Sequence, residues 1–281
     1  MLWNGNSDID RYSRLPSMTG STIDNLPNAF LAGCTKCAST WLWKCFVEHP
    51  EIYAPTKLDR INFFSIHYHK GFEWYRQFFN DLNGQKVVLD PTPEYIKDPL
   101  APERIHKFRP DAKFIFVLRN PINRAYSLWW HQKRKGRINY NFNDVLERKE
   151  IGSFPLYDDW VVSGFYMHWL QGFLNLFPRE NIKLMIYEDL EVDARQFVQE
   201  VFDFLNVDKA FVPSIINTKI NVGKRKNTAP SLTQSIKRLV KPIDEYESGM
   251  DEHIRNELRQ IFEPHNQQLG EFLERDLSFW K

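Results

Sequence analysis

The chain has 281 residues, of which 42% are hydrophobic and 15% aromatic, and its 37 basic and 36 acidic residues give a formal net charge of +1. This length and composition suffice for one large domain with a sizeable core. A net charge so close to zero gives no general attraction for nucleic acid or for an anionic membrane. We therefore expect neither as a partner, and any anion site must be local.

The cysteines and the N-terminus both bear on location. Cys34, Cys37 and Cys45 are too few and too close together to form a disulfide framework, which favours a reducing compartment. Residues 1–25 are polar with scattered charges, so they lack the apolar core of a signal peptide and of a membrane span. We predict a cytoplasmic protein with an N-terminal extension over 1–27 and a single domain over 28–281.

Apolar runs typical of buried strands alternate with segments of helical periodicity. The predicted strands are Ala29–Ala32, Val87–Asp90, Lys113–Leu118 and Ile182–Tyr187. Helical patterns cover Trp41–His49, Pro102–Phe108, a segment beginning at Pro121, Asp158–Phe177, Val192–Leu205 and Asp251–Leu273, and an aromatic-rich loop covers 63–79. This alternation predicts an α/β fold with a parallel sheet covered on both faces, in which ligands bind at the carboxyl ends of the strands.

The turn after the first predicted strand, Gly33–Trp41, is the strongest candidate for an anion site. It joins a strand to the start of a helix, where unpaired backbone N–H groups carry partial positive charge. Lys36 adds a cation, and Ser39 and Thr40 add hydroxyl groups. These groups suit a phosphate or a sulfate.

Two other interpretations compete for the same turn. The Walker A pattern requires Gly-x-x-x-x-Gly-Lys-Ser/Thr, whereas Lys36 follows Gly33 with no second glycine before it, so an ordinary P-loop kinase fits poorly. Cys34 and Cys37 have a redox spacing, but the lysine and the hydroxyl groups would then have no role. Packing as small buried residues is the simplest explanation of the two cysteines.

A second set of candidates follows the strand Lys113–Leu118. Arg119 comes at the end of this strand, and Ser127 lies about two turns into the helix that Pro121 begins. Both side chains can hold one phosphate, with the arginine as a bidentate donor. Two anion sites at neighbouring strand ends predict a ligand with two separated phosphate groups.

Together these motifs resemble those of the sulfotransferases that use 3′-phosphoadenosine-5′-phosphosulfate (PAPS). Further segments are most similar to the sulfotransferase domain of the heparan sulfate N-deacetylase/N-sulfotransferases and their bacterial relatives: Ile61–Phe64, His69–Tyr75, Arg124–Ser127, His131–Gln132 and Ser163–Tyr166. The resemblance implies a P-loop-like, three-layer α/β fold with a central parallel sheet. It also implies an enzyme that moves the sulfuryl group of PAPS to a hydroxyl or amine group and releases the bisphosphate PAP.

The resemblance implies roles for individual residues. The expected PAPS-binding residues are Lys36, Cys37, Ala38, Ser39, Thr40, Trp41, Arg119, Ser127, Tyr166, Gly223, Lys224 and Arg225. Lys36 is also expected to act in catalysis at the leaving phosphate. The first choice for the general base is His131, one turn beyond Ser127, and the other catalytic candidates are Asp59, Asp90 and Glu94.

Two departures from the family pattern leave the acceptor open. Arg60 stands where the heparan enzymes have a catalytic glutamate, and Pro91 stands where the family has a lysine. We predict a small metabolite or natural product as the acceptor. The alternatives are a saccharide acceptor and a nucleotide-binding protein without transfer chemistry. The histidines and carboxylates have no spacing that predicts a metal site, and a homodimer is an open alternative to a monomer.

Overall fold

The structure is a computed structural model that describes residues 25–147, 160–217 and 250–280. Gly223, Lys224 and Arg225 of the predicted donor site lie outside these ranges. The chain divides into two compact units, Met1–Arg119 with His168–Thr218 and Asn120–Met167 with Lys219–Lys281. The single domain over 28–281 stays a prediction.

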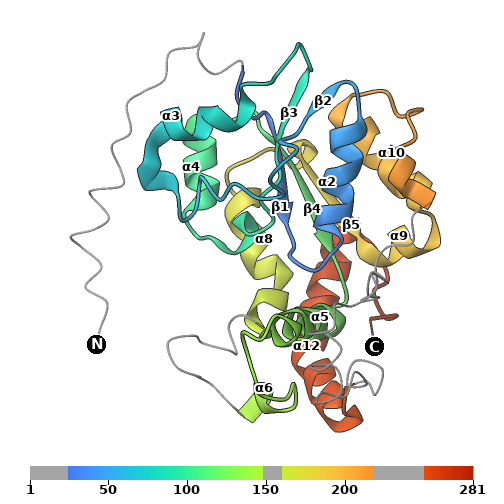
Figure 1. Ribbon diagram of the computed structural model, residues 1–281. Coiled ribbons are helices and arrows are strands. Elements are labelled where there is room, and N and C mark those ends of the chain that lie inside the picture. The colour runs from blue at the N-terminus through green and yellow to red at the C-terminus, as the bar shows by residue number, and fades with distance from the viewer. Residues whose placement is uncertain (1–24, 148–159, 218–249, 281) are drawn as a thin grey trace, which may run out of the picture. The chain divides into compact units, whose positions relative to one another are not determined.

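The first unit contains a five-stranded sheet in the order β2-β3-β1-β4-β5, and all neighbouring strands are parallel (Figure 1). The strands are β1 (Ala29–Gly33), β2 (Ile52–Tyr53), β3 (Val87–Asp90), β4 (Lys113–Leu118) and β5 (Ile182–Ile186). The predicted parallel α/β fold is confirmed. Sequence analysis missed β2, because a strand of two residues is too short to show a hydrophobic period.

Helices cover both faces of this sheet. The helices of the first unit are α2 (Ser39–Glu48), α3 (Gly71–Arg76), α4 (Ala101–Phe108), most of α8 (Tyr166–Leu174), α9 (Tyr187–Val192) and α10 (Ala194–Leu205). Figure 1 shows α2 and α10 on one side of the strands and α3 and α4 on the other. The predicted covering of both faces is therefore confirmed.

The core of the first unit is rich in aromatic contacts. Phe30 on the central strand β1 pairs in register with Phe114 on β4, and their rings stack with centroids 5.4 Å apart. The ring of Phe114 also lies 5.1 Å from that of Phe173 on α8. On α2 and α10, the rings of Phe46 and Phe202 lie 6.4 Å apart. Ring pairs at such separations stabilise a core beyond the apolar area that they bury.

Three predicted segments differ from the observed ones. The predicted loop 63–79 contains short helical turns, η2 (Tyr68–Lys70), α3 and η3 (Gln77–Phe79). The pattern over Asp158–Phe177 is interrupted at Phe165, between the turn η5 (Val162–Gly164) and α8. The pattern over Val192–Leu205 is interrupted at Asp193, because this residue has an extended backbone and its side chain accepts hydrogen bonds from the first N–H groups of α10.

The second unit is built from α5 (Pro121–Arg134), α6 (Asp144–Glu147), η5 and α12 (Glu252–Leu273). The Asn120 side chain caps α5 by accepting hydrogen bonds from the N–H groups of Ile122 and Asn123. Trp129 on α5 and Leu258 and Phe262 on α12 belong to one buried apolar cluster. This cluster gives the unit a core of its own.

None of the helices in the described ranges is long and apolar enough to cross a membrane.

Gly33→Ala should lower the free energy of unfolding by about 1–3 kcal/mol, because it overpacks a filled core. A Cβ atom at this position would lie 2.8 Å from Cδ1 of Phe116 and 3.0 Å from Cβ of Ile96. Urea unfolding measures the loss. Phe116→Val removes the δ carbons, so the double variant should lose less than the sum of the two single variants. Strictly additive losses would show that this contact is not the cause.

Candidate functional site

The turn between β1 and α2 has a backbone that favours an anion. Lys36 (φ 69°) and Ala38 (φ 62°) both adopt the left-handed conformation, which is rare for residues other than glycine. Left-handed residues beside helical ones point successive N–H groups into one concave surface. Ala38 is the residue before α2, and it has no side chain that could cap the first N–H groups of the helix. These groups are therefore suited to a bound anion.

Arg119 contacts this turn directly. It follows the last residue of β4, and its Nη1 donates a hydrogen bond of 3.2 Å to the carbonyl oxygen of Lys36. Its guanidinium carbon lies 4.4 Å from the ring centre of Tyr187, which follows β5 and begins α9. Burial raises the pKa of Tyr187 to about 12, so this ring stays neutral beneath the cation. The structure thus brings together the predicted residues Lys36 and Arg119, and it adds Tyr187, which sequence analysis missed.

The cysteines are buried among packed side chains. Cys34 is 3% exposed and Cys37 and Cys45 are 0% exposed. The N–H of Cys34 donates to the carbonyl oxygen of Val117 at 2.9 Å. Thiols that are this buried are seldom redox-active, so their environment favours the packing interpretation.

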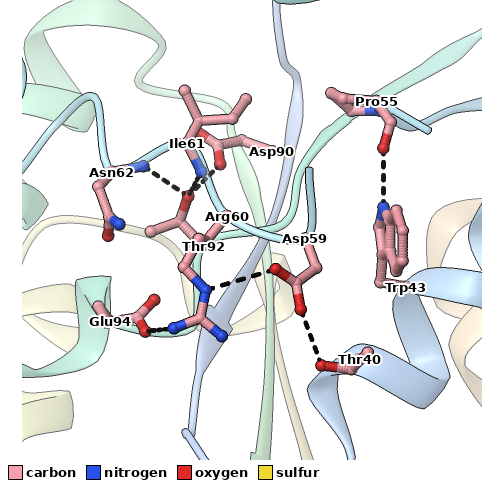
Figure 2. Close-up of polar contacts among 10 residues, drawn as sticks. All are labelled: Thr40, Trp43, Pro55, Asp59, Arg60, Ile61, Asn62, Asp90, Thr92 and Glu94. Atoms are coloured by element: carbon pink, nitrogen blue, oxygen red, sulfur yellow. Dashed lines mark hydrogen bonds and ion pairs between the residues drawn. The ribbon is translucent and has the colours of Figure 1, made fainter. Parts of the chain in front are cut away.

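A chain of charged and polar groups extends from the start of α2 (Figure 2). Thr40 donates a hydrogen bond of 3.0 Å to Oδ2 of Asp59. Oδ1 of Asp59 accepts from Nε of Arg60 at 3.4 Å, and Nη1 of Arg60 lies 2.6 Å from Oε1 of Glu94. Two of the predicted catalytic carboxylates, Asp59 and Glu94, are thus bridged by one arginine and linked to Thr40 of the predicted donor turn.

The two oxygens of Glu94 have different environments. Oε1 pairs with Arg60, whereas Oε2 is buried and has no hydrogen-bond partner within the described residues. The side chain as a whole keeps 28% of its surface exposed. Burial raises the pKa of Glu94, the charge of Arg60 lowers it in part, and the charge of Asp59 raises it. A carboxylate whose pKa is raised is a stronger base than an ordinary glutamate carboxylate.

Asp90 has a buried position that suits a positioning role. Its side chain is 0% exposed, and it accepts hydrogen bonds from Tyr75 at 2.7 Å, from Tyr95 at 2.8 Å and from Thr92 at 2.6 Å. The same hydroxyl oxygen of Thr92 accepts from the N–H groups of Ile61 at 2.9 Å and Asn62 at 3.1 Å. Asp90 therefore holds, through Thr92, the segment that carries Asp59 and Arg60 (Figure 2).

Sequence analysis missed the partners of Asp90, although one signal for them was present. The signal is closeness in the sequence: Thr92 and Tyr95 lie two and five positions after Asp90, in a segment where Pro91 and Pro93 stop the strand. Tyr75 lies fifteen positions away in the aromatic-rich segment, and nothing local to the sequence connects it to Asp90.

The remaining predicted residues belong to other parts of the chain. Ser127 and His131 lie half-buried on α5, and the buried Tyr166 begins α8, with its ring 6.2 Å from that of Trp280. These three residues are in the second unit, so their predicted roles stay predictions. In the part of the chain that the structure describes, no group of three or more histidine, cysteine, aspartate and glutamate side chains could hold a metal ion.

Asp90 should make the stability of the protein fall as the pH rises from about 4 to about 6. Burial raises its pKa to about 6, whereas an aspartate in an unfolded chain titrates near 4. Between these values the folded protein binds the proton more tightly than the unfolded chain, so the free energy of unfolding decreases with rising pH. Across this window the free energy of unfolding of the wild-type protein, relative to that of Asp90→Asn, should fall by up to about 3 kcal/mol.

Urea unfolding of both proteins at several pH values measures this difference. Asp203→Asn is the control, because the hydrogen bond from Lys209 lowers the pKa of the exposed Asp203. Relative to that variant, the wild-type protein should instead gain stability with rising pH. A difference between wild type and Asp90→Asn that does not change with pH would contradict the prediction.

Comparison with known proteins identifies the family. The sequence matches the family described as Sulfotransferase domain over residues 26–276. The human bifunctional heparan sulfate N-deacetylase/N-sulfotransferase 2 is 27% identical over 219 residues, which are 73% of this chain and 25% of that protein. The human heparan sulfate glucosamine 3-O-sulfotransferase 6 is 31% identical over 198 residues, which are 69% of this chain and 56% of that protein.

A solved structure extends the similarity to the fold. The crystal structure of a sulfotransferase from Alicyclobacillus acidocaldarius superposes with a TM-score of 0.71 at 26% sequence identity, covering 90% of this chain and 98% of that chain. The matched segment spans 25% of the length of the N-deacetylase/N-sulfotransferase. The family match, the parallel sheet and the superposition agree: the chain belongs to the sulfotransferase domain family.

Proposed function

We propose that the protein transfers the sulfuryl group of PAPS to a hydroxyl or amine group of an acceptor. The observation that carries this proposal is the turn after β1, in a chain that belongs to the sulfotransferase domain family. This turn combines left-handed backbone at Lys36 and Ala38, an uncapped helix start and a hydrogen bond from Arg119. Each of these features suits a phosphosulfate or a phosphate group.

The residues of the turn have distinct roles in this proposal. Bound PAPS supplies an activated sulfuryl group on a phosphate leaving group. Lys36 and the N–H groups at the start of α2 oppose the negative charge that develops on the leaving oxygen. Arg119 and Ser127 hold the 3′-phosphate. Ala38, Ser39, Thr40 and Trp41 contact the 5′-phosphosulfate, and Cys37 and Tyr166 are further residues of the donor site. Catalysis then depends mainly on positioning and electrostatics, as in phosphoryl transfer.

Two classes of acceptor follow from different observations. The names of both human relatives refer to heparan sulfate, which favours a saccharide acceptor. The absence of the family glutamate at Arg60 and of the family lysine at Pro91 separates this chain from the pattern of those enzymes. This difference favours a small metabolite, which was the expectation from sequence. Both classes therefore belong in one acceptor panel.

Lys36→Ala should reduce sulfuryl transfer by about 100-fold or more, which is the usual effect of removing one charge-stabilising group at a leaving oxygen. The assay supplies sulfur-35-labelled PAPS with unsulfated oligosaccharides in one arm and a metabolite extract in the other, and it counts labelled acceptor. Lys44→Ala is the matched control, because Lys44 is an exposed lysine on the same helix. This variant should retain wild-type transfer.

The same assay separates the competing functions. If the wild-type protein binds PAP in calorimetry but labels no acceptor, the result supports a nucleotide-binding protein and contradicts an enzyme. Stronger thermal stabilisation by ATP than by PAP would favour a kinase. Transfer that requires a reduced thiol and stops in Cys37→Ala would revive the redox interpretation.

A further inference from the structure

The cluster formed by Asp59, Arg60, Asp90 and Glu94 contains three carboxylates, and their hydrogen bonds distinguish them (Figure 2). Both oxygens of Asp59 accept a hydrogen bond, one from Thr40 and one from Arg60. Asp90 is fully buried and accepts from three hydroxyl groups. Only Glu94, among these three, has a carboxylate oxygen without a hydrogen bond from the described residues.

A buried acceptor atom without a donor lowers the stability of a folded protein. Such an atom is uncommon in native structures and calls for an explanation. The position of Oε2 is closed to solvent, whereas the side chain as a whole keeps 28% of its surface exposed. A hydroxyl or amine group of an acceptor would reach the exposed part of the side chain, and it can supply the missing donor to Oε2 once rotation about the last side-chain bond has brought that oxygen there.

Two contacts place Glu94 in relation to the predicted donor turn. Arg60 holds Oε1 of Glu94 with one nitrogen and Oδ1 of Asp59 with another. Asp59 in turn accepts the hydrogen bond from Thr40, the second residue of α2. Thr92 accepts hydrogen bonds from the backbone N–H groups of Ile61 and Asn62, the two residues that follow Arg60, and so fixes their position. The carboxylate is therefore linked to a residue of the donor turn through two side chains, those of Arg60 and Asp59.

We propose that Glu94 is the general base of the transfer reaction and that Arg60 and Asp59 are positioning residues that hold it. This inference rests on the proposed sulfuryl transfer. In the reaction, a bond forms between the acceptor oxygen or nitrogen and sulfur, and the bond between sulfur and the bridging phosphate oxygen breaks. The electron pair of the broken bond leaves with the phosphate of PAP, and the proton of the acceptor passes to the Glu94 carboxylate, which later releases it to water.

If Glu94 is the base, the charges around it should change the pH dependence of the reaction. A purely structural role for Glu94 predicts no such change. A base must be deprotonated, so kcat/KM for the acceptor should rise with pH through the pKa of Glu94. In the described residues the charges that act on Glu94 are those of Arg60, Asp59 and Lys97, and Asp90 is close enough for the charge of Glu94 to raise its pKa. Arg60 and Lys97 lower the pKa of Glu94, and Asp59 raises it.

The acidic limb of the pH profile should therefore move in opposite directions in two variants. Arg60→Gln removes a positive charge and should move the limb to higher pH. Asp59→Asn removes a negative charge and should move it to lower pH. The shift in Arg60→Gln should be roughly half a pH unit or more, the size expected for one charge at hydrogen-bonding distance near a protein surface. The shift in Asp59→Asn should be smaller, because Arg60 lies between the two carboxylates. Lys57→Gln is the matched control, since it removes an exposed charge from the same segment and should leave the limb in place.

Glu94→Gln should lower kcat by about 100-fold or more, because it keeps an oxygen for Arg60 but cannot take a proton. Its affinity for PAP should stay at the wild-type value, which also shows that the variant is folded. Full activity in Glu94→Gln would overturn the assignment. The assignment would also fail if His131→Gln abolished the acidic limb while Arg60→Gln and Asp59→Asn left it unmoved. If the wild-type protein transfers to no acceptor, the proposed function as a whole is contradicted. If both the wild-type protein and Glu94→Gln are active, only the assignment of Glu94 is contradicted.

Discussion

The buried carboxylate of Asp90 is the group on which the arrangement of the candidate site depends. It lies at the end of β3, where hydrogen bonds from Tyr75, Thr92 and Tyr95 replace the water that it loses on folding. Burying a carboxylate costs free energy unless such donors are present. Because Thr92 also accepts hydrogen bonds from the backbone N–H groups of residues 61 and 62, the carboxylate fixes a segment 28 to 29 positions away from it in the sequence. Asp59 and Arg60 immediately precede that segment.

The parallel sheet explains why cationic and anionic groups occur near one another. Parallel strands all end at the same edge, so the residues that follow β1, β3 and β4 are brought to one side of the first unit. Lys36 and Arg119 follow β1 and β4, and Glu94 follows β3. The hydrogen bond between Thr40 and Asp59 links the turn after β1 to the carboxylates. Sulfuryl transfer would use both charges, a cation at the leaving oxygen and a base at the acceptor.

Several features of this edge lower the stability of the fold. Lys36 and Ala38 have left-handed backbone, which costs roughly 1 kcal/mol or more at residues other than glycine. Oε2 of Glu94 is buried without a hydrogen-bond partner among the described residues. The aromatic core beneath the edge, with Phe30, Phe64 and Phe114 in contact, offsets such costs. Strain and unsatisfied groups that collect at one edge are typical of a site that binds or reacts.

The sequence alone determined the local features of this protein. Strands β3 and β4 have the predicted bounds, and α2, α4 and α12 lie within one or two residues of their predicted ranges. The donor turn was found from its glycine, lysine and hydroxyl groups, because these lie together in the chain. Hydrophobic periods and short motifs report local structure, so they miss contacts between distant residues. The pair of Arg60 and Glu94 is 34 positions apart, and the bond of Tyr75 to Asp90 joins two different segments. Only the tertiary structure decided which carboxylates are fully hydrogen-bonded and which one keeps an oxygen without a hydrogen bond from the described residues, because that depends on how the strand ends and loops pack against one another.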